Sequence, residues 1–421
     1  MRPLSPLPDW VSLEHSVAHI LSKQELHGWY FDEPAAWELE SSLRKELEEL
    51  SRVLRNRHTY IGGSSFSPKR SNKRTGYIEG AEFTRLKELN PTSRDHIAWI
   101  LTTHYGWTPS SISSNGKPVV DEIVLKDIGT DIALDFLRCL ELKKALGMIS
   151  EGVNAWLKLC TNASRIHHHC SVGCATFRMA HNKPNLAQVP SGTEFRRLFT
   201  ATPGQVMVGA DLSGIELRML AHYLARYDGG RYADILLNGD IHQVNADKIG
   251  ITRKLVKNVT YAFLYGAGDV KIGLTYDKQL PTTKAKKKGA EIRAAYVAAI
   301  PGLDDLLTAI KVAGDRGFVK AIDGRKVLLD SPHKALNFLL QGSAGVIAKR
   351  WLVIANHHTH DICCSQLAFI HDELQYECHS LHADRLATSL VHCAREAGEY
   401  YKLRCPIDAE SKIGDNWADV H

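Results

Sequence analysis

The stretch Val208-Gly209-Ala210-Asp211-Leu212-Ser213-Gly214-Ile215-Glu216-Leu217-Arg218 lies near the middle of the chain and decides how the rest is interpreted. The apolar run that begins at Val206 predicts a buried strand that delivers Asp211 at its end. A second carboxylate lies far downstream, in Phe369-Ile370-His371-Asp372-Glu373-Leu374, where two short apolar runs predict a tight hairpin with Asp372 at its tip. Alone, each aspartate would more often be a turn or capping residue. Together, on stiff backbone, they predict a site for hard divalent cations, which prefer carboxylate oxygens.

The segment between the aspartates carries cations and aromatic residues four positions apart, at Arg253, Lys257, Tyr261 and Tyr265. A four-residue step moves only about 40° around a helix, so these side chains share one broad face. The cations suit a triphosphate and the aromatic rings suit stacking on a base or sugar, although such a stripe by itself more often packs in a core. His242 is a further candidate for a phosphate contact, and a lone histidine is usually structural.

The composition describes a soluble globular protein. Its 421 residues exceed one ordinary core and predict two or three subdomains. The formal net charge of +5 tolerates a polyanionic partner without requiring one. The sequence contains no uninterrupted apolar run of about 18 residues and no apolar leader at its start. We therefore expect a cytoplasmic protein with no membrane partner.

Nine cysteines at irregular spacings favour reduced thiols over a disulfide framework. Histidines and cysteines gather in two places, which are His167-His168-His169-Cys170 with Cys174, and His357-His358 and His360 with Cys363-Cys364. Neither cluster shows a paired Cys-x-x-Cys, and about 190 residues separate them. We expect surface and turn residues at both places, not a zinc site.

The chain resembles family A DNA polymerases, the polymerase I type, and is most similar to replicative polymerases of short-tailed bacteriophages. Three motifs carry the resemblance in order: Asp211 to Arg218, Arg253 to Gly266 as the finger helix, and His371-Asp372-Glu373. Further similarity lies at Asn90 to Ile97, Pro184 to Gln188, Gly239 to His242, Asp323 to Arg325, and Asn337 to Gln341.

The resemblance implies an α/β (α+β) right-hand fold of thumb, palm and fingers, with the palm built on an antiparallel sheet. The expected ranges are 1–160 for the thumb, 161–223 and 337–421 for the two parts of the palm, and 224–336 for the fingers. Within the thumb, the segment 55–82 reads as a flexible basic tip loop. A solvated loop and a contact with DNA phosphate are equal alternatives for its four cations, Lys69, Arg70, Lys73 and Arg74.

The implied activity is template-directed addition of deoxynucleotides to a primer 3′ end, with two Mg²⁺ ions for which Mn²⁺ is expected to substitute. Asp211, Asp372 and the backbone carbonyl of Leu212 would hold the metal. The triphosphate would be bound by residues of which Lys257 also assists the leaving pyrophosphate, namely Arg253, Lys257 and His242.

Around the nucleotide, Glu216 would crowd the sugar 2′ position and favour deoxynucleotides. Tyr261 would stack near the sugar, and Tyr265 would border the templating base. A tyrosine at position 261 predicts weak discrimination against dideoxynucleotides. Contacts with the primer–template duplex are implied for Arg178, Gln188, Asn337, Gln341 and His371.

The chain departs from the family pattern in places. Phe177 stands where the family usually has glycine, which puts the local turn in doubt, and Gly342 looks like an extra residue after Gln341. The resemblance starts at the thumb, so we expect neither the exonuclease domain nor proofreading in this polypeptide. The expected partners are primer–template DNA and deoxynucleotides, and a separate helicase, primase or exonuclease stays open. A processivity partner at the reduced thumb tip is not expected.

Two other functions fit part of the pattern. A single-subunit RNA polymerase shares the palm chemistry, but Glu216 in place of a small residue argues against it. A catalytically silent DNA-binding subunit would not need both aspartates together with Arg253 and Lys257. Incorporation of ribonucleotides would favour the former, and binding without synthesis would favour the latter.

Overall fold

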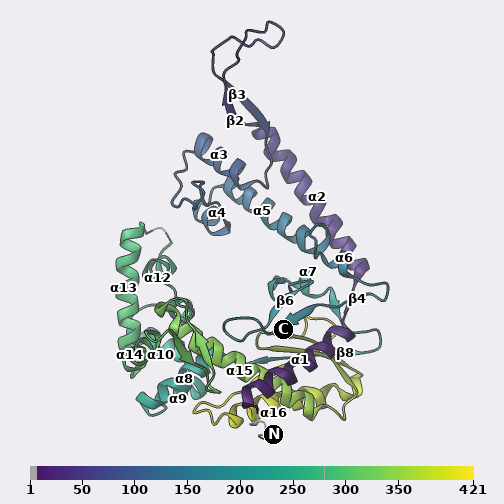
Figure 1. Ribbon diagram of the computed structural model, residues 1–421, viewed down its shortest axis with the longest axis vertical. Coiled ribbons are helices and arrows are strands. Elements are labelled where there is room, and N and C mark those ends of the chain that lie inside the picture. The colour runs from purple at the N-terminus through teal and green to yellow at the C-terminus, as the bar shows by residue number, and fades with distance from the viewer. Residues whose placement is uncertain (1–6, 279) are drawn as a thin grey trace, which may run out of the picture. The chain divides into compact units, whose positions relative to one another are not determined.

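The computed structural model describes residues 7–278 and 280–421 (Figure 1). The chain divides into two compact units, which we call the inserted unit, Pro34–Lys158, and the main unit, formed by the described residues up to Glu33 together with Leu159–His421. Helix α1 (Asp9–His27) falls in the range predicted for the thumb but belongs to the main unit. It does so because its apolar stripe lies in that unit's core, with Leu13, Val17, Ile20 and Leu21 buried.

The main unit contains a four-stranded antiparallel sheet in the order β11-β12-β8-β13. The strands are β8 (Val206–Leu212), β11 (Cys364–Ile370), β12 (Glu373–Cys378) and β13 (Ala409–Gly414). Gly209 in β8 is required by close packing, because a Cβ there would lie 2.6 Å from the carbonyl oxygen of Val420. Helix α16 (Ser380–Tyr400) packs on β8 and β13, and α1 packs on β11, as the lower part of Figure 1 shows.

Helix α15 (Ala335–His358) packs against α1 and α16. With the residues from Pro332 onward, it is long and apolar enough to cross a membrane by length and composition, but 78% of that window is buried inside the protein. Trp351 and Leu352 are fully buried. The apolar character of α15 is therefore that of a core helix.

A helical region separates β8 from α15 in the chain. It contains α8 (Ile215–Asp228), α9 (Arg231–Asn238), α10 (Ile241–Ile249), α11 (Arg253–Leu264), α12 (Asp269–Tyr276), α13 (Thr282–Ala299) and α14 (Leu303–Gly314), followed by β9 (Phe318–Lys320), β10 (Lys326–Leu328) and the short helix η3 (Pro332–Lys334). Helices α12 and α13 approach very closely. A Cβ at Gly289 would lie 1.7 Å from the carbonyl oxygen of Asp269, so only glycine fits there.

Smaller elements lie before β8. A three-stranded sheet has the order β4-β1-β7, and β5 pairs with β6 as a hairpin. Their bounds are β1 (Trp29–Phe31), β4 (Arg165–Ile166), β5 (His169–Ser171), β6 (Ala180–Asn182) and β7 (Phe199–Thr200), with the short helices η2 (Leu186–Gln188) and α7 (Thr193–Arg196) between β6 and β7.

The inserted unit is mostly helical and has its own core, which includes Leu54, Ile97 and Phe136. Its elements are α2 (Glu33–Arg57), β2 (Tyr60–Phe66), β3 (Phe83–Glu88), α3 (Arg94–Tyr105), α4 (Glu122–Ile128), α5 (Asp131–Leu146), the π-helical turn η1 (Gly147–Glu151) and, at its end, α6 (Trp156–Leu159).

The prediction of a flexible loop over 55–82 is wrong. Helix α2 continues to Arg57, and β2 pairs with β3 as an antiparallel hairpin (Figure 1). The hairpin is held by aromatic packing, because the ring of Tyr77 lies 5.2 Å from that of Phe66 and 4.9 Å from that of Phe83. Periodicity missed β2 because glycines and serines interrupt its apolar positions. The four cations stay exposed in the connection between the strands, at Lys69, Arg70, Lys73 and Arg74.

Candidate active site

Asp211 and Asp372 are presented by neighbouring strands of the main sheet. Asp211 is the penultimate residue of β8, and Asp372 lies in the turn between β11 and β12, as the sequence predicted. The backbone N–H of Leu212 donates to the carbonyl oxygen of Asp372 at 3.0 Å. His371 makes the turn possible with φ +58°, a conformation that costs a non-glycine residue about 1–2 kcal/mol. The backbone therefore holds the two carboxylates side by side.

The electrostatics of this pair suit a bound cation. Desolvation by the surrounding protein, followed by the charge of Asp372, raises the pKa of Asp211 to about 7. Desolvation and then Glu216 raise the pKa of Asp372 to about 6. Within residues 7–278 and 280–421, neither carboxylate forms an ion pair with Lys, Arg or His. Two adjacent carboxylates without a cationic partner are a donor set that fits hard divalent metal ions.

Glu216 connects three of the predicted site residues. It lies in the first turn of α8 and is only 9% exposed. Its Oε1 accepts hydrogen bonds from Nη2 of Arg178 at 2.7 Å and from the hydroxyl of Tyr265 at 2.9 Å. Nδ2 of Asn337 in turn donates to the backbone carbonyl of Tyr265 at 2.9 Å. Residues that lie far apart in sequence thus meet beside the two aspartates.

Helix α11 confirms the predicted finger helix. Thr252 caps it by accepting a hydrogen bond from the backbone N–H of Leu255, and the helix ends at Leu264, with Tyr265 as the cap residue. Arg253 and Lys257 are exposed and Tyr261 is half-buried, so the stripe does not form a core. The core face is a different one, with Val256, Val259, Thr260 and Phe263 buried.

His242 and Arg253 meet beside α11. The His242 ring in α10 is 8% exposed and lies 6.3 Å from the ring of Tyr261. Desolvation and then Arg253 lower the pKa of His242. Sequence reasoning missed Asp240, whose Oδ2 accepts from Nε of Arg253 at 2.6 Å and which also caps α10. Its position immediately before a helix was the available signal.

Comparison with known proteins assigns the chain to a family. The model of the DNA polymerase family A matches residues 68–419. The chain belongs to this family. It is a DNA-directed DNA polymerase, that is, a nucleotidyltransferase. The DNA-directed DNA polymerases of Enterobacteria phage T3 and Escherichia phage T7 are each 33% identical to it over 98% of this chain and 70% of their own length.

More distant relatives agree. DNA polymerase I of Pseudomonas aeruginosa is 25% identical over 80% of this chain and 39% of its own length. Among solved structures, the POL domain of Pol1 from M. smegmatis, in complex with DNA primer–template and dNTP, superposes with a TM-score of 0.79 at 20% identity, covering 96% of this chain and 70% of that one. This likeness confirms the predicted right-hand fold.

This polymerase keeps the turn before Arg178 despite lacking the family glycine. Phe177 takes φ +60°, the left-handed conformation that glycine adopts easily. The guanidinium of Arg325 lies 4.4 Å from the centre of the Phe177 ring. Gly342 lies inside α15, where a Cβ would come 3.7 Å from the Phe177 ring and 3.1 Å from Val327. A larger residue at 342 would crowd this packing, so the two departures accommodate each other.

The remaining predicted duplex contacts lie on different elements. Gln188 ends η2 and is exposed, and Gln341 lies one turn after Asn337 on α15. Among the residues that the structure describes, no side-chain hydrogen bond joins either glutamine to the rest of the site. Desolvation and then Arg178 lower the pKa of His371, which is half-buried beside Asp372.

Sequence reasoning missed a buried support behind Asp211. Glu373 lies opposite Asp211 in the sheet and is 6% exposed. It accepts a hydrogen bond from Nε1 of Trp417 at 2.6 Å and pairs with Nδ1 of His421 at 3.3 Å. No local signal reveals this support, because 44 residues separate Glu373 from Trp417.

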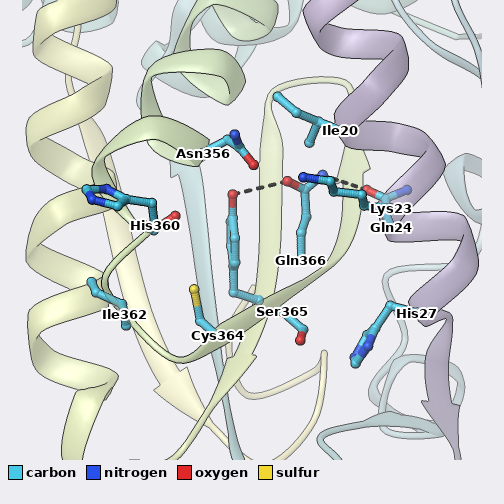
Figure 2. Close-up of a pocket in the computed structure, with 12 residues that line it drawn as sticks. Ile20, Lys23, Gln24, His27, Asn356, His360, Ile362, Cys364, Ser365 and Gln366 are labelled. Carbon is cyan, nitrogen blue, oxygen red and sulfur yellow. Dashed lines mark hydrogen bonds between the residues drawn. The ribbon is translucent and has the colours of Figure 1, made fainter.

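A cavity of about 360 Å³ lies elsewhere in the main unit, between α1, the end of α15, β11 and β12. Figure 2 shows Gln24 from α1 facing Gln366 from β11 across it. None of the predicted site residues lines this cavity. It is therefore separate from the constellation around Asp211 and Asp372.

Proposed function

We propose that this polymerase extends a primer 3′ end by two-Mg²⁺ nucleotidyl transfer at Asp211 and Asp372. One observation carries the proposal: the bond from Leu212 to Asp372 holds two carboxylates side by side without a cationic partner among the described residues. Family A DNA polymerases use divalent metal ions. When bound, two such ions activate the primer 3′ oxygen and neutralise the triphosphate. The carbonyl of Leu212 would complete the ligand set, and Mn²⁺, which accepts the same oxygen ligands, would substitute.

The exposed face of α11 would orient the nucleotide. Arg253 and Lys257 offer two cations to the triphosphate, and Lys257 would stabilise the leaving pyrophosphate. His242 would add a contact next to them. Tyr261 would pack against the sugar, and Tyr265, held by Glu216, would border the templating base.

Glu216 would exclude ribonucleotides by occupying the space next to the sugar 2′ position. The duplex would be contacted through phosphates and the minor groove, where the hydrogen-bond acceptors are shared by all correct pairs, by Arg178, Gln188, Asn337, Gln341 and His371. The solved relative that carries DNA primer–template and dNTP supports these partners. The ranges 1–160, 161–223, 224–336 and 337–421 remain our assignment of thumb, palm, fingers and palm. The phage relatives support action in the host cytoplasm.

Primer extension on a recessed template with Mg²⁺ tests the proposal. We expect extension with deoxynucleotides and not with ribonucleotides. Asp211→Asn and Asp372→Asn should each lower kcat by about 10²-fold or more while duplex binding survives, because each removes a group needed only for transfer. Asp384→Asn, an exposed aspartate on α16, is the matched control and should be fully active.

Three results would contradict the proposal. Retained synthesis in either aspartate variant would remove that residue from the metal site. Efficient ribonucleotide extension would favour the RNA polymerase alternative, and duplex binding without any synthesis would favour the silent subunit. A labelled primer with a mismatched 3′ end should also stay undegraded, and its shortening would contradict the expected lack of proofreading.

A further inference from the structure

A cysteine and two histidines meet in the interior of the main unit, at the β5–β6 hairpin. Cys170 lies directly opposite His181 in this hairpin, and His168 immediately precedes β5. One ligand atom from each side chain lies within 4.8 Å of the others. Sγ of Cys170 is 3.3 Å from Nδ1 of His181.

All three side chains are buried. His168 is 0%, His181 8% and Cys170 9% exposed, so the expectation of surface residues is wrong for His168 and Cys170. Strand alternation is the reason, since neighbouring side chains point to opposite faces. His167 and His169 face outward, where their Nδ1 atoms lie 2.7 Å and 2.8 Å from oxygens of Glu25.

The triad also has unmet hydrogen-bonding capacity. Within the described residues, Nδ1 of His168 and Nε2 of His181 are buried without a partner. On a further side lies a neutral amide, because Nε2 of Gln24 is 3.1 Å from Nε2 of His168 and 3.7 Å from Sγ of Cys170. Gln366 orients this amide by donating to Oε1 of Gln24 at 2.7 Å, as Figure 2 shows. The buried, unpartnered nitrogens make a purely structural hydrogen-bond cluster an incomplete explanation.

We propose that His168, Cys170 and His181 bind one Zn²⁺ ion. Thiolate and imidazole are the ligands that zinc prefers in proteins. For Zn–S near 2.3 Å and Zn–N near 2.1 Å, tetrahedral geometry places sulfur and nitrogen about 3.5 Å apart, close to the separation of Cys170 and His181. On binding, the thiol of Cys170 releases its proton to solvent and the Zn–S bond forms, without any redox change. The fourth coordination position lies on the side of Gln24.

The site would stabilise a part of the active-site wall. The connection between β5 and β6 carries Arg178, which binds Glu216. The ring of His181 also lies 5.9 Å from that of His371, next to Asp372. A metal at the base of the hairpin would therefore hold in place elements that contact the nucleotide pocket, without taking part in transfer.

Cobalt substitution on the full chain tests the proposal. Apoprotein titrated with Co²⁺ should develop thiolate-to-cobalt charge-transfer absorption, which Zn²⁺ then removes at one equivalent per chain. Cys170→Ser should abolish this absorption and weaken zinc binding by about 100-fold or more, since a ligand matters at least as much as its outer-shell partners. Cys174→Ser, in the same connection but outside the triad, is the matched control and should behave as the parent protein.

Alkylation followed by mass spectrometry gives a second readout that needs no variant. Zn²⁺ should protect Cys170, and not Cys174, from modification in the parent protein, so a misfolded Cys170→Ser leaves the question decidable. Three outcomes overturn the proposal: no thiolate absorption in the parent, equal alkylation of Cys170 with and without Zn²⁺, or zinc affinity unchanged in a folded Cys170→Ser. The last would place the ion at the aspartates instead.

Discussion

Glu216→Ala asks whether one carboxylate both shapes the sugar pocket and holds its walls together. Oε1 accepts from Arg178 at 2.7 Å and from Tyr265 at 2.9 Å, and the side chains of Glu216 and Arg178 are 12% and 17% exposed. Alanine removes both bonds and leaves the guanidinium without this partner. We therefore expect lower stability together with a pocket that admits ribonucleotides.

The magnitude follows from these contacts. Removing one partner of a buried ion pair costs about 3–5 kcal/mol. The charge of Asp372 also favours the Arg178 cation, so we expect the lower end, a loss of about 3 kcal/mol in the free energy of unfolding. Tyr265→Phe removes one bond and keeps the ion pair, which should cost about 1.5 kcal/mol.

Urea unfolding of the two single variants and the double variant measures the energies. Because both substitutions remove the same bond, the double variant should be about 1.5 kcal/mol more stable than the sum of the single losses predicts. The kcat/KM ratio of ribonucleotide to deoxynucleotide should rise in Glu216→Ala. Glu216→Gln preserves the volume of the side chain and should retain discrimination while losing part of the stability. A Glu216→Ala protein with a stability loss below about 1 kcal/mol and an unchanged ratio would refute the reasoning.

Three further predictions concern separate parts of the chain. Tyr261→Phe should raise discrimination against dideoxynucleotides in competition with deoxynucleotides, and an unchanged incorporation ratio would remove Tyr261 from the sugar pocket. Desolvation and then Arg404 lower the pKa of His222 to about 4, below its ordinary 6.5. The unfolded chain then binds the extra proton first, so the contribution of His222 is complete above pH 6.5 and is lost as pH falls toward 4. Stability–pH curves of His222→Gln should be flatter in that window, and parallel curves would contradict this. Neutralising the cations between β2 and β3 should flatten the salt dependence of DNA binding by up to about 0.9 per phosphate contact and lower processivity, whereas unchanged binding would leave a solvated connection, at Lys69, Arg70, Lys73 and Arg74.

Local patterns were sufficient wherever a structure depends on near neighbours. The apolar run before Asp211, the turn at His371 and Asp372, and the four-residue spacing from Arg253 each predicted an element that the structure contains. Family membership and the right-hand fold were also predicted from the sequence and confirmed by comparison. The roles of the individual site residues remain predictions.

Tertiary structure decided what these elements contact. The sequence by itself determined that α1 has an apolar stripe, but not that this stripe packs in the main unit. It placed Glu216 after Asp211, but not between Arg178 and Tyr265. It marked Cys170 as one member of a His/Cys cluster, while only the hairpin pairing brings it to His181. The physical reason is common to all three: periodicity specifies which face of an element is apolar or polar, whereas the partner of that face depends on chain segments that folding brings together from far away in the sequence.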